Sequence, residues 1–354
     1  MAQYAHLSDP DPEWAAVSAN LPLATPLVSF QTLREEVAAF RAKLDLKTKK
    51  VTDGLKVVER MIQVENGEIR ARAYIPDSQE DNSGFPLMVW MFGGGFVIGS
   101  IDDDDAFLRN LAVNSKIVCV GGDYRKAPEH PFPAAVNDSY ASLKWALNNS
   151  SEFSIDASKG VIVGGVSAGG NLAAVLAHKS SKDPELGGRV TGQLLVMPVI
   201  IAPQAYPDKF KSELLSLDKD EDKYMLTKSE HIQCTGKTMI FRSIYQYITE
   251  YYFIEAYHCN IHAINPDVSP ILAESFEGLP PAYIQIAGLD ILRDEAFLYE
   301  RLLKEAGVLT KVDVFGERYA GLPHGFHVDF KDLEETKRQE RDFVDGLDWL
   351  LNRK

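Results

Sequence analysis

A serine set between glycines is the feature of this sequence that points most directly to chemistry. Ser167 lies in the run Gly165–Gly169 (GVSAG), after an apolar run that reads as a strand and before a run that reads as a helix. A nucleophilic serine needs such a strand-to-helix turn, because the turn lifts its hydroxyl out of the backbone and places it at a helix N-terminus. An ordinary glycine-rich turn can have a similar sequence, but the position between a predicted strand and a predicted helix favours a nucleophile.

Three consecutive glycines, Gly93–Gly95, form a second candidate. They follow the apolar run Leu87–Phe92, which reads as a strand. Glycines in this place let backbone N–H groups point into a cavity, as an oxyanion hole requires. A phosphate-binding loop is disfavoured, because no Lys-Ser/Thr pair follows and the spacing is wrong for a P-loop. A purely structural turn stays open.

A nucleophilic serine also needs a base, and the base needs a carboxylate that orients it. Asp290 follows the apolar run Ala282–Ala287, and His324 follows the last strand-like run of the chain. A chain of this length contains many aspartates and histidines. These two carry weight because each comes just after a predicted strand, where the loops of a parallel sheet form binding sites. His327 is the competing base.

The elements that must position these residues are read from the apolar pattern. From Pro86 onward, short runs that are apolar throughout alternate with longer helical runs, which predicts a mostly parallel sheet with helices on both faces. Before it, Val57–Val64 and Ile69–Ile75 flank Asn66-Gly67, the dipeptide that best fits a tight hairpin turn. The expected strands of the parallel part are Leu87–Phe92, Ile117–Val120, Gly160–Val166, Gln193–Met197, Ala282–Ala287 and Lys311–Phe315. The expected helices are Ala134–Leu147, Ala168–Ser180, Asp294–Ala306 and Glu334–Leu351.

We expect the chain to divide into four parts. The N-terminal part reads as irregular to about Ser29 and then as an amphipathic helix over Phe30–Leu46. A long stretch between two halves of the sheet is rich in tyrosine and charge, and we expect it to cover the functional edge. The parts are residues 1–50 (N-terminal cap or helical segment), 51–201 (first part of the sheet domain), 202–262 (cap insertion) and 263–354 (second part of the sheet domain).

Composition narrows the class of protein. The 354 residues carry 51 Asp+Glu against 37 Lys+Arg, a formal charge of −14, which disfavours nucleic acid and anionic membrane as partners. No apolar run approaches the roughly 20 residues of a membrane span, and the N-terminus does not resemble a secretory signal. Three scattered cysteines, Cys119, Cys234 and Cys259, suit neither a disulfide framework nor a zinc site, and Cys119 is expected in the core. A cytoplasmic, metal-free protein without integral membrane association is the expectation.

Several motifs between Pro86 and the C-terminus resemble the hormone-sensitive-lipase-like family of α/β-hydrolases, the carboxylesterase and lipase group. The chain order Ser, Asp, His is the order that α/β-hydrolases use. The resemblance implies the α/β-hydrolase fold, with a mostly parallel central sheet, helices on both faces and a helical cap. The motifs are GGGFVIGS, DYRKAPEHPFPAAVND (Asp123–Asp138), GVSAGGNLAA, SPILA, GLPPAYIQIAGLDILRDEA and LPHGFH.

The resemblance also implies a role for each candidate residue. Ser167 corresponds to the nucleophile, His324 to the general base and Asp290 to the triad acid. The implied reaction is hydrolysis of a small-molecule carboxylic ester or lactone through an acyl-enzyme, with no cofactor and no metal. A homodimer is compatible with the family, and the sequence leaves the oligomeric state open. The oxyanion donors would be the amides of Gly94, Gly95 and Ala168.

One departure from the family pattern affects the predicted function. The position before the three glycines, usually histidine, is Phe92 here. Because that histidine helps to hold the glycine loop, its absence motivates a second hypothesis: a non-hydrolytic protein of the same fold, acting as a dehydratase, a cyclase or a small-molecule-binding protein. A segment of the expected cap, 230–258, also looks longer than the usual connection.

The remaining polar residues have structural interpretations. Asp294 and Glu295 are expected to cap their helix and to favour its dipole. Glu129 and His130 are expected to be hydrogen-bonded in a loop beside the active site. The run Asp102–Asp105 is expected to be a solvated loop at a helix start, since four adjacent carboxylates do not converge on one ion.

Overall fold

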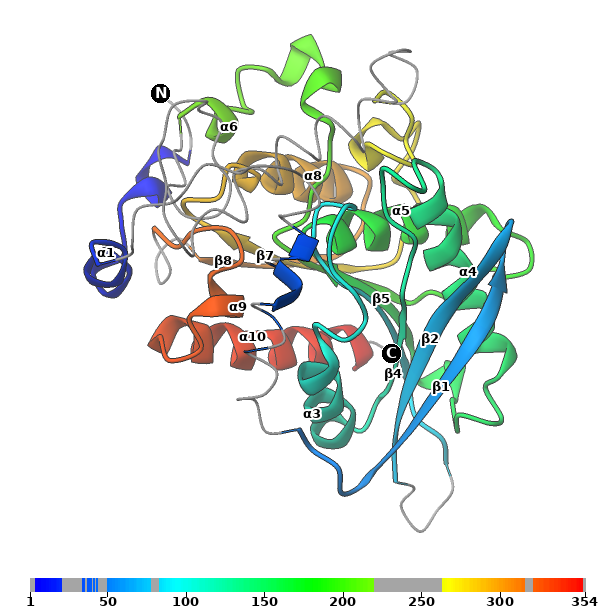
Figure 1. Cartoon of the computed structure of the whole chain (residues 1–354). Helices are drawn as coiled ribbons and strands as arrows, with labels where there is room; N and C mark the ends of the chain where they lie inside the picture. Colours follow the sequence, from blue (N-terminus) through cyan, green and yellow to red (C-terminus); the bar gives the residue numbers. More distant parts are fainter. Residues whose placement is uncertain are drawn as a thin grey trace.

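A twisted sheet of eight strands forms the centre of the protein (Figure 1). The computed structural model describes residues 4–20, 34, 35, 37–39, 41, 43, 50–77, 83–219, 263–315 and 321–352. The spatial order of the strands is β1-β2-β4-β3-β5-β6-β7-β8. β2 pairs antiparallel with β1 and β4, and every other neighbouring pair is parallel. The strands are β1 Leu55–Val64, β2 Gly67–Pro76, β3 Leu87–Met91, β4 Val118–Gly122, β5 Val161–Val166, β6 Gly192–Val196, β7 Ala282–Ala287 and β8 Thr310–Phe315.

Helices cover the sheet on both faces, as expected (Figure 1). On one face α3 and α10 lie together, and the rings of Phe107 and Phe343 join them at 5.1 Å between centroids. On the other face α5 lies beside α4 and contacts α8 through His178 and Tyr299. The five long helices are α3 Asp105–Ser115, α4 Ala134–Asn148, α5 Ala168–Lys182, α8 Arg293–Glu305 and α10 Glu334–Leu351.

The expected strands and the expected hairpin are confirmed, with ends that move by one or two residues. At the hairpin turn Asn66 has φ 57°, a left-handed conformation that asparagine adopts more readily than most residues. The four expected helices are confirmed as well. The helix α3 was not among them, although its buried residues Leu108, Leu111 and Ala112 are spaced as on one face of a helix.

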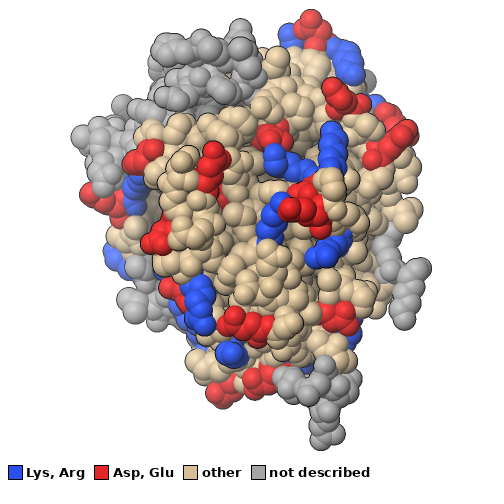
Figure 2. Space-filling model, turned by 90° about the vertical axis from the view of Figure 1, so that its right-hand side faces the viewer, with Lys and Arg blue, Asp and Glu red and all other residues tan. Residues whose placement is uncertain are grey.

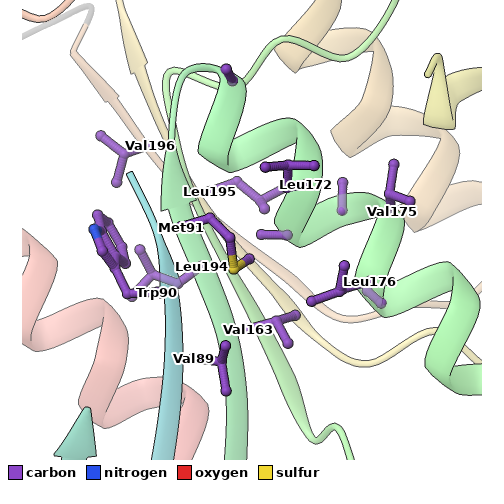
Figure 3. Close-up of a cluster of buried hydrophobic side chains, with 14 of the residues drawn as sticks. Val89, Trp90, Met91, Val163, Leu172, Val175, Leu176, Leu194, Leu195 and Val196 are labelled. Carbon is purple, nitrogen blue, oxygen red and sulfur yellow. The ribbon is translucent and has the colours of Figure 1, made fainter. Parts of the chain in front are cut away.

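The core lies where the parallel strands meet α5 (Figure 3). Here the strands are apolar throughout because both of their faces are covered. Side chains of β3, β5 and β6 pack against Leu172, Val175 and Leu176 of the helix, all of them buried. Cys119 of β4 is fully buried, as expected, and burial raises the pKa of its thiol. This rigid centre supports the turn that follows β5.

The expectation of an irregular N-terminal segment is wrong. Residues Ala5–Ser8 form a 3₁₀ turn and Pro12–Ser18 form the helix α1. The carboxylate of Asp11 accepts the amides of Glu13 and Trp14, which is the geometry of an N-terminal cap followed by proline. Trp14 is buried and meets Phe330 edge to face at 5.2 Å.

Two expected segments fall partly outside the described residues. Within the expected helix Phe30–Leu46, residues 34, 35, 37–39, 41 and 43 are helical. Of the expected cap insertion 202–262, the described part contains the 3₁₀ turns Pro203–Ala205 and Asp208–Phe210 and the short helix α6 Ser216–Lys219. The stretch 220–262, which includes 230–258, lies outside the described residues, and the four expected parts stay a prediction.

The run Asp102–Asp105 begins α3, as expected, but the expectation of a solvated loop is wrong for Asp105. This side chain is 2% exposed and accepts hydrogen bonds from Arg72 at 3.0 Å and from the Tyr74 hydroxyl at 2.9 Å. Arg72 also binds the exposed Asp102 at 2.7 Å. Because arginines of β2 bind carboxylates of this run, the ion pairs fasten the hairpin to α3. Figure 2 shows that acidic and basic side chains are interspersed over the face that it presents.

Candidate active site

The turn between β5 and α5 places Ser167 alone between a strand and a helix. The strand ends at Val166 and the helix begins at Ala168. Ser167 has φ 58° and ψ −118°, a strained conformation for a residue with a side chain. The turn is close to its neighbours: a Cβ on Gly169 would lie 2.0 Å from the carbonyl oxygen of Met91. The sequence around Ser167 therefore folds into the sharp turn that exposes a serine hydroxyl.

The structure brings Ser167, His324 and Asp290 into one chain of hydrogen bonds. Nε2 of His324 lies 2.9 Å from Oγ of Ser167, and Nδ1 lies 2.7 Å from Oδ2 of Asp290. The other oxygen of Asp290 accepts the amide of Leu292 at 2.9 Å. Asp290 is 1% exposed and His324 is 5% exposed. In this geometry Nδ1–H donates to the carboxylate of Asp290, and Nε2 is the ring nitrogen that faces the Ser167 hydroxyl.

Two turns after parallel strands carry Asp290 and His324, the candidate acid and base. The acid turn (Gly288–Leu292) follows β7, and the base turn (Gly321–Gly325) comes after β8 in the chain. Behind the base turn, the amide of Gly325 donates to Sδ of Met197 at 3.3 Å. Met197 has φ 45°, so this side chain reaches the base turn from a strained position just after β6. Sequence reasoning missed Met197, because a buried methionine after a strand looks like a core residue.

The glycine loop (Gly93–Gly95) lies directly against the turn that carries Ser167, called the nucleophile turn below. A Cβ on Gly93 would lie 3.6 Å from Cβ of Ser167. Gly94 and Gly95 have φ 130° and 60°, a conformation that residues with side chains rarely adopt. Within the part of the chain that the structure describes, the amides of Gly94, Gly95 and Ala168 have no protein acceptor. These N–H groups are therefore available to a ligand beside Ser167.

Phe92, which stands where the family usually has histidine, is buried in a ring stack. Its ring lies parallel to that of Tyr124, with 4.1 Å between centroids and 6° between planes. The Tyr124 hydroxyl donates to the carbonyl oxygen of Phe92 at 2.9 Å. The start of the glycine loop is thus held by a tyrosine from the DYR motif. Tyr124 is visible in the DYR motif of the sequence, but the motif does not indicate that its hydroxyl binds the carbonyl oxygen of Phe92.

His327 does not take part in the hydrogen-bond chain. It lies in the short helix α9 (Phe326–Asp329), and its Nδ1 is buried without a partner among the described residues. Burial lowers the pKa of His327 to about 3, so the ring is neutral near pH 7. Of the two candidate histidines, His324 is the one that meets Ser167.

The expected capping role of Asp294 and Glu295 is wrong. Both lie in the first turn of α8, but the N-cap residue Leu292 makes no side-chain cap, and the amide of Asp294 donates to the hydroxyl of Ser216 at 3.2 Å. Asp294 accepts the amides of Leu215 and Ser216 at 2.9 and 2.8 Å, and Glu295 accepts the amide of Ile200 at 2.8 Å. Burial raises the pKa of Glu295 well above its usual range. These carboxylates connect distant segments, which adjacent sequence could not indicate.

The segment with Glu129 and His130 lies next to the glycine loop. The carboxylate of Glu129 accepts a hydrogen bond from Arg34 at 2.5 Å, and this bond lowers its pKa below the usual value. Arg34 also donates to the carbonyl oxygen of Val97 at 2.9 Å. The amide of His130 donates to the carbonyl oxygen of Lys126 at 2.9 Å. Glu129 is therefore hydrogen-bonded, as expected.

With fold and geometry in hand, comparison with known proteins identifies the family. The sequence profile of a family described as having the α/β-hydrolase fold matches residues 88–328 of this chain. This protein belongs to the hormone-sensitive-lipase-like family of α/β-hydrolases. The family assignment and the fold class made from the sequence are thereby confirmed.

Relatives of this hydrolase are similar over most of their length. Esterase LipI of Mycobacterium tuberculosis is 32% identical over 283 residues, which covers 79% of each chain. The crystal structure of vibralactone cyclase matches with a TM-score of 0.83 and 32% identity, over 98% of this chain and 96% of that one. An esterase of Pyrobaculum calidifontis matches with a TM-score of 0.77 and 31% identity, over 97% and 99%.

Neither a membrane span nor a metal site is found among the described residues. Among the helices formed by the described residues, none is long and apolar enough to cross a bilayer. In the same residues, no group of three or more His, Cys, Asp or Glu side chains is arranged to hold a metal ion.

Proposed function

We propose that this protein is a serine hydrolase that cleaves carboxylic esters or lactones through an acyl-enzyme. The observation that carries the proposal is the hydrogen-bond chain from Ser167 through His324 to Asp290, at a strained turn beside a loop of free amides. A nucleophile, a base in reach of its proton and a carboxylate that orients the base are the parts that this chemistry needs.

In the first half of the reaction Ser167 attacks the ester carbonyl. Its Oγ forms a bond to the carbonyl carbon while its proton moves to Nε2 of His324. Asp290 holds the imidazole in the required tautomer and stabilises its positive charge. When the tetrahedral intermediate collapses, the carbon–oxygen bond to the alcohol breaks. The proton on Nε2 passes to that oxygen, so that the alcohol leaves neutral.

The second half repeats the cycle with water. His324 takes a proton from water as the hydroxide oxygen attacks the acyl carbon, and it returns the proton to Oγ of Ser167 as the acid leaves. In both halves the oxyanion would rest on the amides of Gly94, Gly95 and Ala168. One such donor is worth about 3 to 4 kcal/mol of barrier in comparable sites. The steps balance without a cofactor.

The proposed substrate class rests on the relatives. The relatives include esterases such as LipI, and small-molecule esters need no extended binding surface. A cytoplasmic location and a homodimer stay predictions.

Turnover of short-chain p-nitrophenyl esters tests the proposal. Wild type should hydrolyse them, and Ser167→Ala should lose at least about 10³-fold in kcat, because the hydroxyl within hydrogen-bond distance of His324 Nε2 is removed. A fluorophosphonate probe followed by peptide mapping should label Ser167 in the wild type alone. Equal rates from wild type and Ser167→Ala would reject Ser167 as the nucleophile.

A second candidate function keeps the site but not the hydrolysis. Two observations favour it: Phe92 in place of histidine, and the similarity to the crystal structure of vibralactone cyclase. If a hydroxyl of the acyl group itself attacks the acyl-enzyme in place of water, the product is a lactone. A dehydratase or a small-molecule-binding protein belongs to the same group of non-hydrolytic alternatives.

Labelling and product analysis together separate these candidates. A binding protein would fail to react with the fluorophosphonate probe although it is folded. A cyclase would react at Ser167, but mass spectrometry of its products from a hydroxy-ester would show the lactone in place of the acid. The hydrolase should react and release the acid.

A further inference from the structure

The acid turn is fastened to a buried arginine. The carbonyl oxygen of Gly288 accepts a hydrogen bond from Nη1 of Arg293 at 2.7 Å, and the carbonyl oxygen of Asp290 accepts the amide of Arg293 at 3.1 Å. Both ends of the short stretch that presents Asp290 are therefore bound by one residue. Arg293 is 2% exposed, although an unpaired buried guanidinium would be very costly.

The place of Arg293 in its helix is unfavourable for a cation. It is the first residue of α8, where the helix dipole is positive and stabilises acidic side chains. Its Nε donates to Oδ1 of Asp294 at 2.9 Å, and its Nη1 also donates to Oγ of Ser8 at 2.8 Å. A buried arginine at this position does not stabilise the helix. The hydrogen bonds of Arg293 to the acid turn explain why it is there.

Asp294 connects the acid turn to the segment that contains Leu215 and Ser216. Its Oδ2 accepts the amides of Leu215 and Ser216. The hydroxyl of Ser216 in turn donates to the carbonyl oxygen of Ile291 at 2.7 Å, inside the acid turn. The segment that ends the described part of the expected cap insertion is thus hydrogen-bonded to the turn that carries Asp290.

The acid turn and the base turn are also joined to each other. The amide of Leu289 donates to the carbonyl oxygen of Leu322 at 3.0 Å, and the amide of Gly321 donates to the carbonyl oxygen of Leu7 at 3.1 Å. The N-terminal residues that meet Arg293 therefore also meet the base turn. A displacement of this assembly would change the distance between Asp290 and His324.

We propose that Arg293 and Asp294 are positioning residues that hold the acid turn so that Asp290 faces Nδ1 of His324. They do so by binding the turn to Ser8 and to Leu215–Ser216. The inference rests on the proposed function, because it assigns Asp290 the role of orienting the base. Misplacement of a catalytic group by about 1 Å can cost about 10²-fold in rate, so a clamp of this kind acts on catalysis without touching substrate.

Three substitutions test the clamp in the full-length protein. Asp294→Asn replaces one carboxylate oxygen by an NH₂ group, which cannot accept from both Arg293 and the 215–216 amides. Arg293→Met keeps the volume but removes the donors to Gly288. Ser216→Ala deletes a single hydroxyl at the edge of the clamp, and its small size makes it the variant that most readily folds.

The matched control breaks an ion pair between the same helix and the same segment without touching the acid turn. Arg301 of α8 binds Glu213 at 2.7 Å and is 40% exposed at its side chain. Arg301→Gln should leave kcat, KM and the pH profile for p-nitrophenyl butyrate unchanged.

We expect Asp294→Asn and Arg293→Met to lower kcat by about 10- to 100-fold with little change in KM, and Ser216→Ala by roughly threefold to tenfold. The acid limb of the kcat/KM profile should move to lower pH, because a displaced Asp290 stabilises the protonated imidazole less. The melting temperature and fluorophosphonate labelling of Ser167 are measured in parallel.

The outcomes separate the clamp from the proposed function. A wild type that neither labels at Ser167 nor hydrolyses esters overturns the proposed function, and the clamp with it. A wild type that does both, together with variants that melt earlier but keep the wild-type kcat and acid limb, overturns the clamp alone. If Asp294→Asn and Arg293→Met do not fold, the kcat and acid limb of Ser216→Ala decide.

Discussion

Phe92 and Tyr124 together support the start of the glycine loop. The stacked ring pair fills the space beside the loop, and the Tyr124 hydroxyl binds the Phe92 carbonyl at 2.9 Å. A Cβ on Gly99 would lie 2.8 Å from the Phe92 ring, so the ring has little room to move. We interpret the departure from histidine as a change in how the loop is held. Among the described residues, the amides of Gly94 and Gly95 in this loop have no protein acceptor.

Removing the Tyr124 hydroxyl should loosen the oxyanion loop. We expect Tyr124→Phe to lower kcat for p-nitrophenyl acetate by about tenfold, less than the 10²- to 10³-fold cost of deleting a donor itself. Unfolding free energy should fall by about 1 kcal/mol, since one buried carbonyl loses its partner. Steady-state kinetics and urea denaturation measure the two effects.

Tyr140→Phe is the matched control for that substitution. The Tyr140 hydroxyl binds Asp183, away from the glycine loop. This variant should keep the wild-type kcat. If both tyrosine variants have wild-type kcat, the hydroxyl of Tyr124 does not support the loop.

The two histidines near the C-terminal strand allow a direct comparison. His324→Gln should lower kcat by at least about 10³-fold, because Ser167 loses the group that accepts its proton. His327→Gln should keep kcat within about threefold, since this ring has no bond to Ser167, Asp290 or His324. Stopped-flow kinetics with p-nitrophenyl acetate would measure both. A large loss of kcat in His327→Gln alone would contradict this assignment.

At the residue scale, the sequence was informative where signals are local. Ser167, Asp290 and His324 could be found because each follows an apolar strand run, and the structure brings the three together. The roles of Arg293 and Asp294 could not be found, because their partners Ser8 and Ser216 lie far away in the sequence. An acidic residue in the first turn of a helix looks the same whether it caps its own helix or binds a distant loop.

At the scale of elements, the position of α5 against the end of β3 determines whether the nucleophile turn can form. The helix begins so close to the strand that only hydrogen fits on the Cα of Gly169, where a Cβ would lie 2.0 Å from Met91 O and 2.6 Å from Phe92 O. Both neighbours are backbone atoms of the strand end and of the glycine loop. A side chain at position 169 must therefore push the start of α5 away from the end of β3 and from the residue before the glycine loop.

Gly169→Ala should consequently damage both stability and activity. We expect a loss of about 1 to 3 kcal/mol in unfolding free energy from overpacking, with kcat lowered by at least about tenfold. Gly121→Ala is the control, because a Cβ there meets its nearest atom at an ordinary 3.7 Å. Chemical denaturation and ester hydrolysis by both variants test this. Wild-type activity in Gly169→Ala would show that α5 can shift without affecting the site.

The features that were predicted wrongly lack a clear apolar pattern. The helix α1 carries a clear start signal in Asp11-Pro12-Glu13, which a reading based on apolar spacing passed over. The burial of Asp105 had no local signal, because its partners Arg72 and Tyr74 come from the hairpin. Strands β3 to β7 were predictable for the opposite reason: they are buried almost throughout, and a strand covered on both faces is largely apolar.

At the scale of the whole molecule, the site is assembled from parts of the chain on either side of the segment 202–262. The nucleophile and the glycine loop come before it, and the acid and base turns come after it. The two parts meet behind the site, where His178 of α5 lies 3.3 Å from the Tyr299 hydroxyl of α8. His178 is 7% exposed and its Nδ1 has no partner among the described residues.

The burial of His178 should make stability depend on pH. Burial, with a smaller contribution from Lys182, lowers its pKa from 6.5 to about 4, while Asp267 acts in the opposite direction. The folded protein therefore keeps this ring neutral when the unfolded chain begins to take up a proton. As pH falls from about 6.5 to about 4, the unfolded state is favoured, and His178 contributes a loss of up to about 3 kcal/mol.

Comparison of the wild type with His178→Phe separates the contribution of His178 to the pH dependence of stability from that of other titratable groups. The raised pKa of Glu295 has the opposite consequence, since stability is lost as pH rises through it, but both proteins contain Glu295. Between pH 7.5 and pH 5, wild type should lose about 1 to 2 kcal/mol more unfolding free energy than His178→Phe, whose ring suits a site beside Phe276. His6→Gln, at an exposed position, should follow the wild type. Urea denaturation at several pH values measures these differences, and equal pH slopes for wild type and His178→Phe would contradict a neutral His178 between α5 and α8.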